Sequence, residues 1–193
     1  MSTSPKQSSS IWITLAAAIA LAALPTGDAS AQIEPNDQGF SVAPTIGYAV
    51  LRDEDGSEEF EGDSTAIAVD FEWRLMRYLG LGINVTEFGE AEDEFNGVDT
   101  TLEANGFGFF VRGILPVSDY VELYARVGRF AYSTDLTPGG GSSFLFNEDA
   151  DEYGVGIDIR TSTRWSIRLE HRELDGEDRE SASYTGIGFR FQL

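Results

Sequence analysis

The sequence predicts an all-β protein: an eight-stranded antiparallel up-and-down transmembrane β-barrel, preceded by a cleavable signal peptide. Three observations predict it. Apolar residues alternate with polar or small residues in eight separate stretches, and a period of two is that of a β-strand. The connections between these stretches alternate between short and long, as in transmembrane barrels. The face opposite the apolar one carries glycine and charge side by side, which suits a narrow interior.

The first element is a targeting segment over residues 1–31. An apolar run at residues 11–24 is ended by Pro25 and Gly27, and Ala29-Ser30-Ala31 matches the small-x-small cleavage pattern. The run has fourteen residues, fewer than the ~20 that a membrane-spanning helix needs. We therefore predict a secretory signal peptide cleaved near Ala31. Residues 32–39 then form a short N-terminal segment, and residues 40–193 form the barrel domain.

Eight strands follow, each marked by an apolar stripe. In chain order the stripes lie at residues 40–50, 67–75, 79–85, 107–111, 121–127, 153–159, 165–169 and 187–193. The first is weakened by Pro44, because proline cannot donate a hydrogen bond to a sheet ladder. The fourth is blurred by Asn105, Gly106 and Gly108. The eighth runs up to the carboxyl end.

The connections divide into two kinds. Short ones lie around residues 76–77, 116–118 and 161–163, and long polar ones at 52–64, 87–100, 133–151 and 173–182. Barrels of the outer membrane have short turns on the periplasmic side and longer loops outside. Strands of ~10 residues, with these turns and loops, use the whole chain. An even strand number places both ends of the mature chain at the short-turn side.

The polar face decides which side of the barrel meets lipid. It carries seven arginines and five acids in near balance, and buried charges persist only when they are paired. We therefore predict that this face is the lumen, with a charge network of Asp70, Glu72, Arg74, Arg112, Glu122, Arg126, Asp158, Arg160, Arg168, Glu170, Arg172 and Arg190. The glycine pairs 106/108, 154/156 and 186/188 make room for these side chains.

Aromatic residues gather at the short-turn ends of the strands. Trp73 and Trp165 have the parity of the apolar stripes, and Tyr78 and Tyr120 open strands at the same level. Tryptophan and tyrosine concentrate where hydrocarbon meets headgroups. The sequence therefore predicts an aromatic belt of Trp73, Tyr78, Tyr120, Trp165 and Phe191.

Composition excludes several classes of function. The net charge is −20, which opposes binding to a nucleic-acid phosphate backbone. There is no cysteine, and therefore neither a disulfide framework nor a thiolate metal site. The acidic stretches, residues 53–63 and 148–152 among them, lack the spacing of a calcium-binding loop. We expect solvated acidic loops, with no bound metal and no cofactor.

Two outward-facing residues near the long-loop rim are candidates for lipid contact. His171 is the single histidine, and a serine such as Ser181 or Ser183 beside it would suggest acyl chemistry. The oxyanion donors that such chemistry requires are not recognisable, so we expect a rim histidine and no catalytic residue. Arg129 is a candidate for contact with a lipopolysaccharide phosphate.

Two segments resemble the small eight-stranded outer-membrane barrels of the OmpA and OmpX type: residues 115–128, LPVSDYVELYARVG, and residues 184–191, YTGIGFRF. The resemblance covers about residues 40–193 and implies a Gram-negative outer membrane. It also implies that Phe189, Phe191 and Leu193 form the C-terminal signal read by the barrel-insertion machinery. The chain departs from the family pattern by ending in leucine where phenylalanine is usual, and we expect no periplasmic domain of the OmpA type after the barrel.

The expected function is a non-enzymatic, structural or surface-contact role, with membrane lipid and lipopolysaccharide as partners and a monomer as the expected state. A narrow porin-like channel for small or hydrophobic solutes is the main alternative. A lipid-modifying outer-membrane enzyme and a soluble periplasmic lipid carrier are the others.

Overall fold

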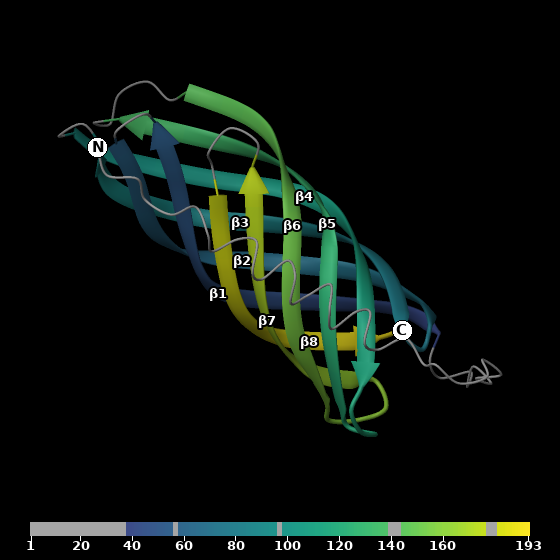
Figure 1. Cartoon of the computed structure of the whole chain (residues 1–193). Helices are drawn as coiled ribbons and strands as arrows, with labels where there is room; N and C mark the ends of the chain where they lie inside the picture. Colours follow the sequence, from purple (N-terminus) through teal and green to yellow (C-terminus); the bar gives the residue numbers. More distant parts are fainter. Residues whose placement is uncertain (1–37, 56–57, 96–97, 139–143, 177–180) are drawn as a thin grey trace, which may run out of the picture.

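The computed structural model describes residues 38–55, 58–95, 98–138, 144–176 and 181–193. They form a closed barrel in which each strand pairs antiparallel with its neighbours in sequence and β8 closes onto β1 (Figure 1). The strands are β1 (Gly39–Asp55), β2 (Glu58–Met76), β3 (Leu79–Phe95), β4 (Val98–Pro116), β5 (Val121–Pro138), β6 (Phe144–Arg160), β7 (Trp165–Gly176) and β8 (Ser181–Gln192). The predicted eight-stranded up-and-down barrel is confirmed. The predicted signal peptide lies outside the described residues.

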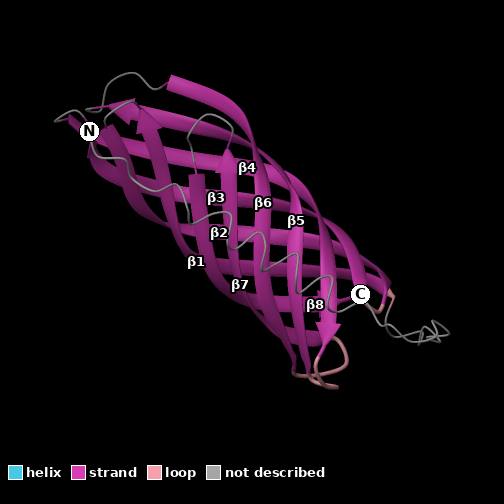
Figure 2. Cartoon of the chain, in the orientation of Figure 1, coloured by secondary structure: helices cyan, strands magenta, loops and turns pink. Residues whose placement is uncertain are grey.

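Short connections gather at one end of the barrel (Figure 2). Serine side chains shape two of them, because the hydroxyl oxygen accepts backbone hydrogen bonds that the turn would otherwise leave unmade. Ser118 Oγ accepts from the Val121 N–H at 3.1 Å, and Ser162 Oγ from the Trp165 N–H at 3.1 Å. The carboxyl end lies at this same end of the barrel, where the Leu193 N–H donates to the Phe40 carbonyl at 2.9 Å.

At the other end the strands run further than the apolar stripes predict. Strands β1 to β6 have 17–19 residues, and β7 and β8 have 12. The stretches 52–64, 87–100, 133–151 and 173–182, expected as long loops, are therefore largely paired strand. Arg52 is the Cα partner of Glu61, for example, and Glu92 that of Thr101. The expectation of long loops was wrong.

The apolar face of the sheet changes sides along the strands, which explains this error. Near the short turns the apolar side chains point outward, and Phe109 of β4 is 63% exposed. Further along the same strand Leu102 points inward and is 6% exposed. A backbone ladder continues through such a change, since its hydrogen bonds do not depend on which face is apolar. Because the apolar stripe on the outer face ends at this change, the sequence pattern predicted that the strand ends there too.

In the part of the barrel next to the short turns, which we call the lower part, the apolar side chains lie outside and the charged ones inside, the reverse of a soluble protein. Large apolar side chains cover its outer surface, among them Ile46, Phe71, Ile83, Phe107 and Ile187, each between 46% and 63% exposed. Charged side chains fill its interior. This outer surface, which we call the apolar belt, matches the lipid-facing band of a transmembrane barrel and argues against a water-soluble carrier. No helix in the described ranges is long and apolar enough to cross a membrane.

Candidate functional site: the lumen and the outer wall

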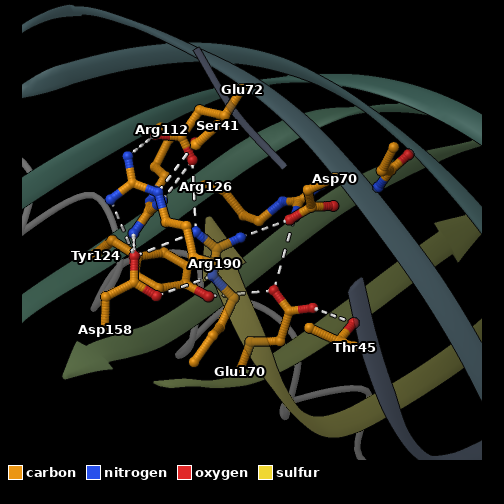
Figure 3. A network of polar contacts seen from close by, with 12 residues as sticks. Ser41, Thr45, Asp70, Glu72, Arg112, Tyr124, Arg126, Asp158, Glu170 and Arg190 are labelled. Atoms are coloured by element: carbon orange, nitrogen blue, oxygen red, sulfur yellow. Dashed lines mark hydrogen bonds and ion pairs between the residues drawn. The ribbon is translucent and has the colours of Figure 1, made fainter. Parts of the chain in front are cut away.

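Twelve charged side chains are buried inside the barrel, six of each sign. Among the described residues the buried arginines are Arg74, Arg112, Arg126, Arg168, Arg172 and Arg190, and the buried acids are Asp70, Glu72, Glu122, Glu152, Asp158 and Glu170. They come from β2, β4, β5, β6, β7 and β8, so the network joins opposite walls (Figure 3). Equal numbers matter because a buried charge without a partner is very costly.

Asp158 is the centre of this network. It accepts hydrogen bonds from Arg112 at 2.6 Å and from Arg168 at 2.9 Å, and it lies 3.6 Å from Arg190. Arg112 also donates to Glu72, and its guanidinium lies 3.7 Å from the centre of the Tyr124 ring. These contacts link β2, β4, β5, β6, β7 and β8 across the lumen.

At the short-turn end the network reaches the barrel mouth. Arg74 donates to Glu122 at 2.9 Å and to the Arg77 carbonyl at 2.6 Å. Arg160 also lies 3.4 Å from Glu122, but its side chain is 41% exposed. Its place in the lumen therefore needs correction. Arg160 is the last residue of β6 and lies at the rim, where water can solvate it.

Glu152 is a lumen residue that the sequence analysis missed, because it was assigned to an acidic loop. It is fully buried, accepts two 3.0 Å hydrogen bonds from the Asn84 amide, and lies 2.8 Å from Arg126. The alternation of inward and outward residues along β6 could have identified it. Glu152 continues the inward series of Gly154, Gly156 and Asp158 along β6, and it supplies a sixth acid.

Above the charges the lumen becomes apolar. Leu51, Phe88, Leu102, Phe130 and Leu174 point inward, each 8% exposed or less, and pack with several alanines into one cluster. The Phe88 and Phe130 rings meet edge to face, with centroids 6.3 Å apart. Such an arrangement is favourable for aromatic pairs. This apolar layer occupies the lumen on the side where the strands extend beyond the apolar belt.

Glycines give the large lumen side chains their space. A Cβ at Gly156 would overlap the ring of Tyr124, and one at Gly154 would come within 2.8 Å of Arg126 Cγ. In contrast, Gly113 is on the outer wall, and a Cβ there would meet nothing nearer than 3.9 Å. The two inward glycines are therefore required by the neighbouring side chains.

The aromatic residues expected as a belt lie at the short-turn end. Trp73 stacks on Phe40 with centroids 5.6 Å apart, and Trp165 lies 4.6 Å from Phe191. Tyr120 is 68% exposed, and Tyr78 lies beside Arg77. Of the residues expected as an insertion signal, Phe189 lies on the outside of β8 and is 57% exposed, and Leu193 follows the end of β8 and is 73% exposed.

Comparison with known proteins agrees with this architecture. The family model described as "Outer membrane protein beta-barrel domain" matches residues 14–192. The chain belongs to this family. No curated protein matches the sequence.

Solved structures of other outer-membrane barrels resemble this family member in fold. Neisserial surface protein A has a TM-score of 0.61 at 13% identity, covering 80% of this chain and 97% of the other. The N-terminal barrel of Pseudomonas aeruginosa OprF has 0.57 at 13%, covering 80% and 98%. Yersinia pestis Ail, solved with the heparin analogue sucrose octasulfate, has 0.53 at 15%, covering 79% and 99%. At these identities the likeness concerns the fold alone.

On the outer wall of this outer-membrane barrel, His171 does not meet a serine. Its Nδ1 lies 2.8 Å from Thr185 Oγ1, and its Nε2 lies 3.6 Å from a Glu173 carboxylate oxygen. The two serines considered as nucleophiles are in register with other residues: Ser183 with Glu173, and Ser181 with Asp175. His171 is instead the Cα partner of Thr185.

Acidic side chains dominate the outer wall above the apolar belt. Within the described part of the chain, the outward acids include Glu61, Asp63, Glu87, Glu90, Glu92, Glu103, Asp149, Asp151 and Asp175. Arg129 pairs with Asp151 at 2.7 Å, and Arg52 with Glu61 at 2.9 Å. No group of three or more described His, Asp or Glu side chains is arranged to hold a metal ion.

Proposed function

We propose that this outer-membrane barrel is a closed, non-enzymatic structural protein that presents an acidic wall to the cell exterior. The lumen supports the proposal most directly: six arginines and six acids fill its lower part, and an apolar layer covers them. An ion crossing it would have to displace buried ion pairs, each of which costs several kcal/mol to break. It would then have to pass an apolar layer that carries hydroxyl groups, such as those of Thr100 and Thr134, but, among the described residues, no buried charge.

The acidic outer wall above the apolar belt, which we call the projecting wall, supports a role in surface contact. The β1–β2, β4–β5 and β5–β6 ladders run through from the membrane part, and the β3–β4 ladder resumes after a register shift between Phe88 and Ala91. The acids therefore lie on a paired sheet and not on free loops. Closely spaced carboxylates favour cationic or cation-bridged partners and repel polyanions. We therefore expect weak binding of heparin-like sulfated sugars, in contrast to the ligand with which Ail was solved.

Planar-bilayer recording tests the closed-barrel proposal. The purified, refolded protein is expected to give no steady unitary conductance. A matched control is Arg52→Gln, which removes a charge from the outer wall, where Arg52 pairs with Glu61. A steady conductance that shifts with Arg112→Gln or Glu72→Gln and not with Arg52→Gln would establish the narrow channel instead.

Localisation is tested separately. Membrane fractionation followed by electrophoresis with and without boiling is expected to show the protein in the outer membrane, as a compact species that shifts on heating. Recovery of the unboiled protein from the periplasmic fraction without detergent would refute the membrane assignment.

A further inference from the structure

A hollow of about 340 Å³ opens on the outer wall over β4, β5 and β6. Its lining includes Asn105, Phe107, Ala131, Ser133 and Asp149. Phe107, Ala131 and Asp149 are Cα partners across the three strands. The small Ala131 therefore lies between an exposed phenyl ring and an exposed carboxylate, which explains why the wall is hollowed here.

The hollow spans the upper edge of the apolar belt. Phe107 and Phe109 are both 63% exposed and are the last large apolar residues on the outside of β4, before Asn105 and Glu103. On β5 the outward series changes from Val127 to Arg129. A molecule in this hollow would have apolar wall beneath it and polar groups above, so its occupant is amphiphilic.

The charges around the hollow specify the headgroup. Within the described residues, Asp149 is exposed and has no ion-pair partner. Arg129, which is 42% exposed and paired with Asp151, stands two residues below Ala131 on β5. At a rise of ~3.3 Å per residue, this is an offset of roughly 7 Å along the strand. An anion alone would meet repulsion from Asp149, and a neutral sugar would leave this carboxylate uncompensated. A headgroup with a phosphate near the acyl chains and an ammonium beyond it matches both charges.

We propose that this hollow binds the phosphoethanolamine headgroup of an outer-leaflet amphiphile. The ammonium pairs with Asp149, the phosphate meets the guanidinium of Arg129 alongside Asp151, and the first methylenes lie on Phe107. The Asn105 amide and the Ser133 hydroxyl line the upper part of the hollow. The inference rests on the proposed function to the extent that this wall must face the outer leaflet. Two sources share the chemistry: phosphatidylethanolamine, and a glycolipid that carries phosphoethanolamine.

The test is a titration of the folded barrel in detergent micelles, followed by the amide NMR signals of residues 129–133. Short-chain phosphatidylethanolamine is compared with short-chain phosphatidylglycerol, which keeps the phosphate and lacks the ammonium. The ethanolamine lipid is expected to bind about fivefold more tightly, the size of one partly exposed charge pair. Lipid A with and without phosphoethanolamine forms the second arm. The tighter of the two ethanolamine-bearing amphiphiles identifies the source.

Three variants complete the design. Asp149→Asn is expected to abolish the preference for ethanolamine. The control is Asp175→Asn, which removes another exposed acid of the outer wall; Asp175 is the Cα partner of Asp151. This variant is expected to keep the preference for ethanolamine. Ala131→Leu fills the hollow and is expected to weaken both lipids. Equal binding of the ethanolamine and glycerol lipids, or equal effects of Asp149→Asn and Asp175→Asn, would overturn the proposal. Heat-shift electrophoresis of each sample shows separately whether the barrel has folded, so failure of the membrane-barrel assignment is distinguishable.

Discussion

Replacing Asp158 by asparagine tests whether charge balance in the lumen stabilises the barrel. The change keeps the size of the side chain but leaves six buried arginines facing five acids. Asp158 is 2% exposed and contacts three of those arginines, at 2.6, 2.9 and 3.6 Å. Breaking a buried pair by removing one partner costs about 3–5 kcal/mol, because a charge remains buried without compensation. We expect Asp158→Asn to lower the free energy of unfolding by that amount.

The assay is reversible urea unfolding of the barrel in lipid vesicles, with heat-shift electrophoresis as the readout of the folded form. Asp175→Asn is the control, since it removes an exposed acid and is expected to change stability by less than about 0.5 kcal/mol. Adding Arg112→Gln to Asp158→Asn restores equal numbers of charges and should recover part of the loss. A loss below about 1 kcal/mol for Asp158→Asn, or a double variant that is less stable by the full sum of both losses, would refute the charge-balance reasoning.

Two further predictions concern glycine and pH. Gly156→Val should prevent recovery of the compact species that shifts on heating, because the valine side chain would overlap the Tyr124 ring. The control Gly113→Val, on the outer wall, should fold normally. Equal yields of the two folded variants would contradict the space-making role of Gly156. On the projecting wall, local desolvation and the neighbouring Glu90 carboxylate raise the pKa of Glu103 above 4.5. The folded state therefore holds this proton more tightly than the unfolded state, so the contribution of Glu103 to stability falls as pH rises from about the unfolded pKa through the folded one. Glu103→Gln should flatten that part of the urea-midpoint profile against pH, and an unchanged profile would contradict it.

The fold was predictable because lipid and a narrow lumen impose a strict pattern on the sequence. In β4, Phe107, Phe109 and Val111 alternate with Gly108, Phe110 and Arg112, and this parity alone assigns the outer and inner faces. The two-residue period also predicted eleven of the residues that the structure buries in the charge network. It overlooked Glu152, which follows the same parity, because the surrounding acids resembled a loop.

The projecting part of the barrel was not predictable in this way. At Leu102 and Phe88 the apolar residues turn inward, and acids such as Glu87 and Glu103 are exposed on the outer wall there. Each half of such a strand has a clear pattern, but the two halves contradict each other when they are read as one stripe. Only the pairing register of β4 with β5 shows that the ladder continues through this change.

The sequence by itself determined the number of strands, their order and, along the predicted apolar stripes, the face that each side chain occupies, because a period of two leaves each residue one of two sides. The tertiary structure decided which charges pair. Arg112 pairs with Glu72 and Asp158, which are 40 and 46 positions away in the sequence. Arg126 pairs with Asp70, 56 positions away, and with Glu152. Such partners depend on the stagger between strands when the sheet closes, and no local pattern encodes that stagger.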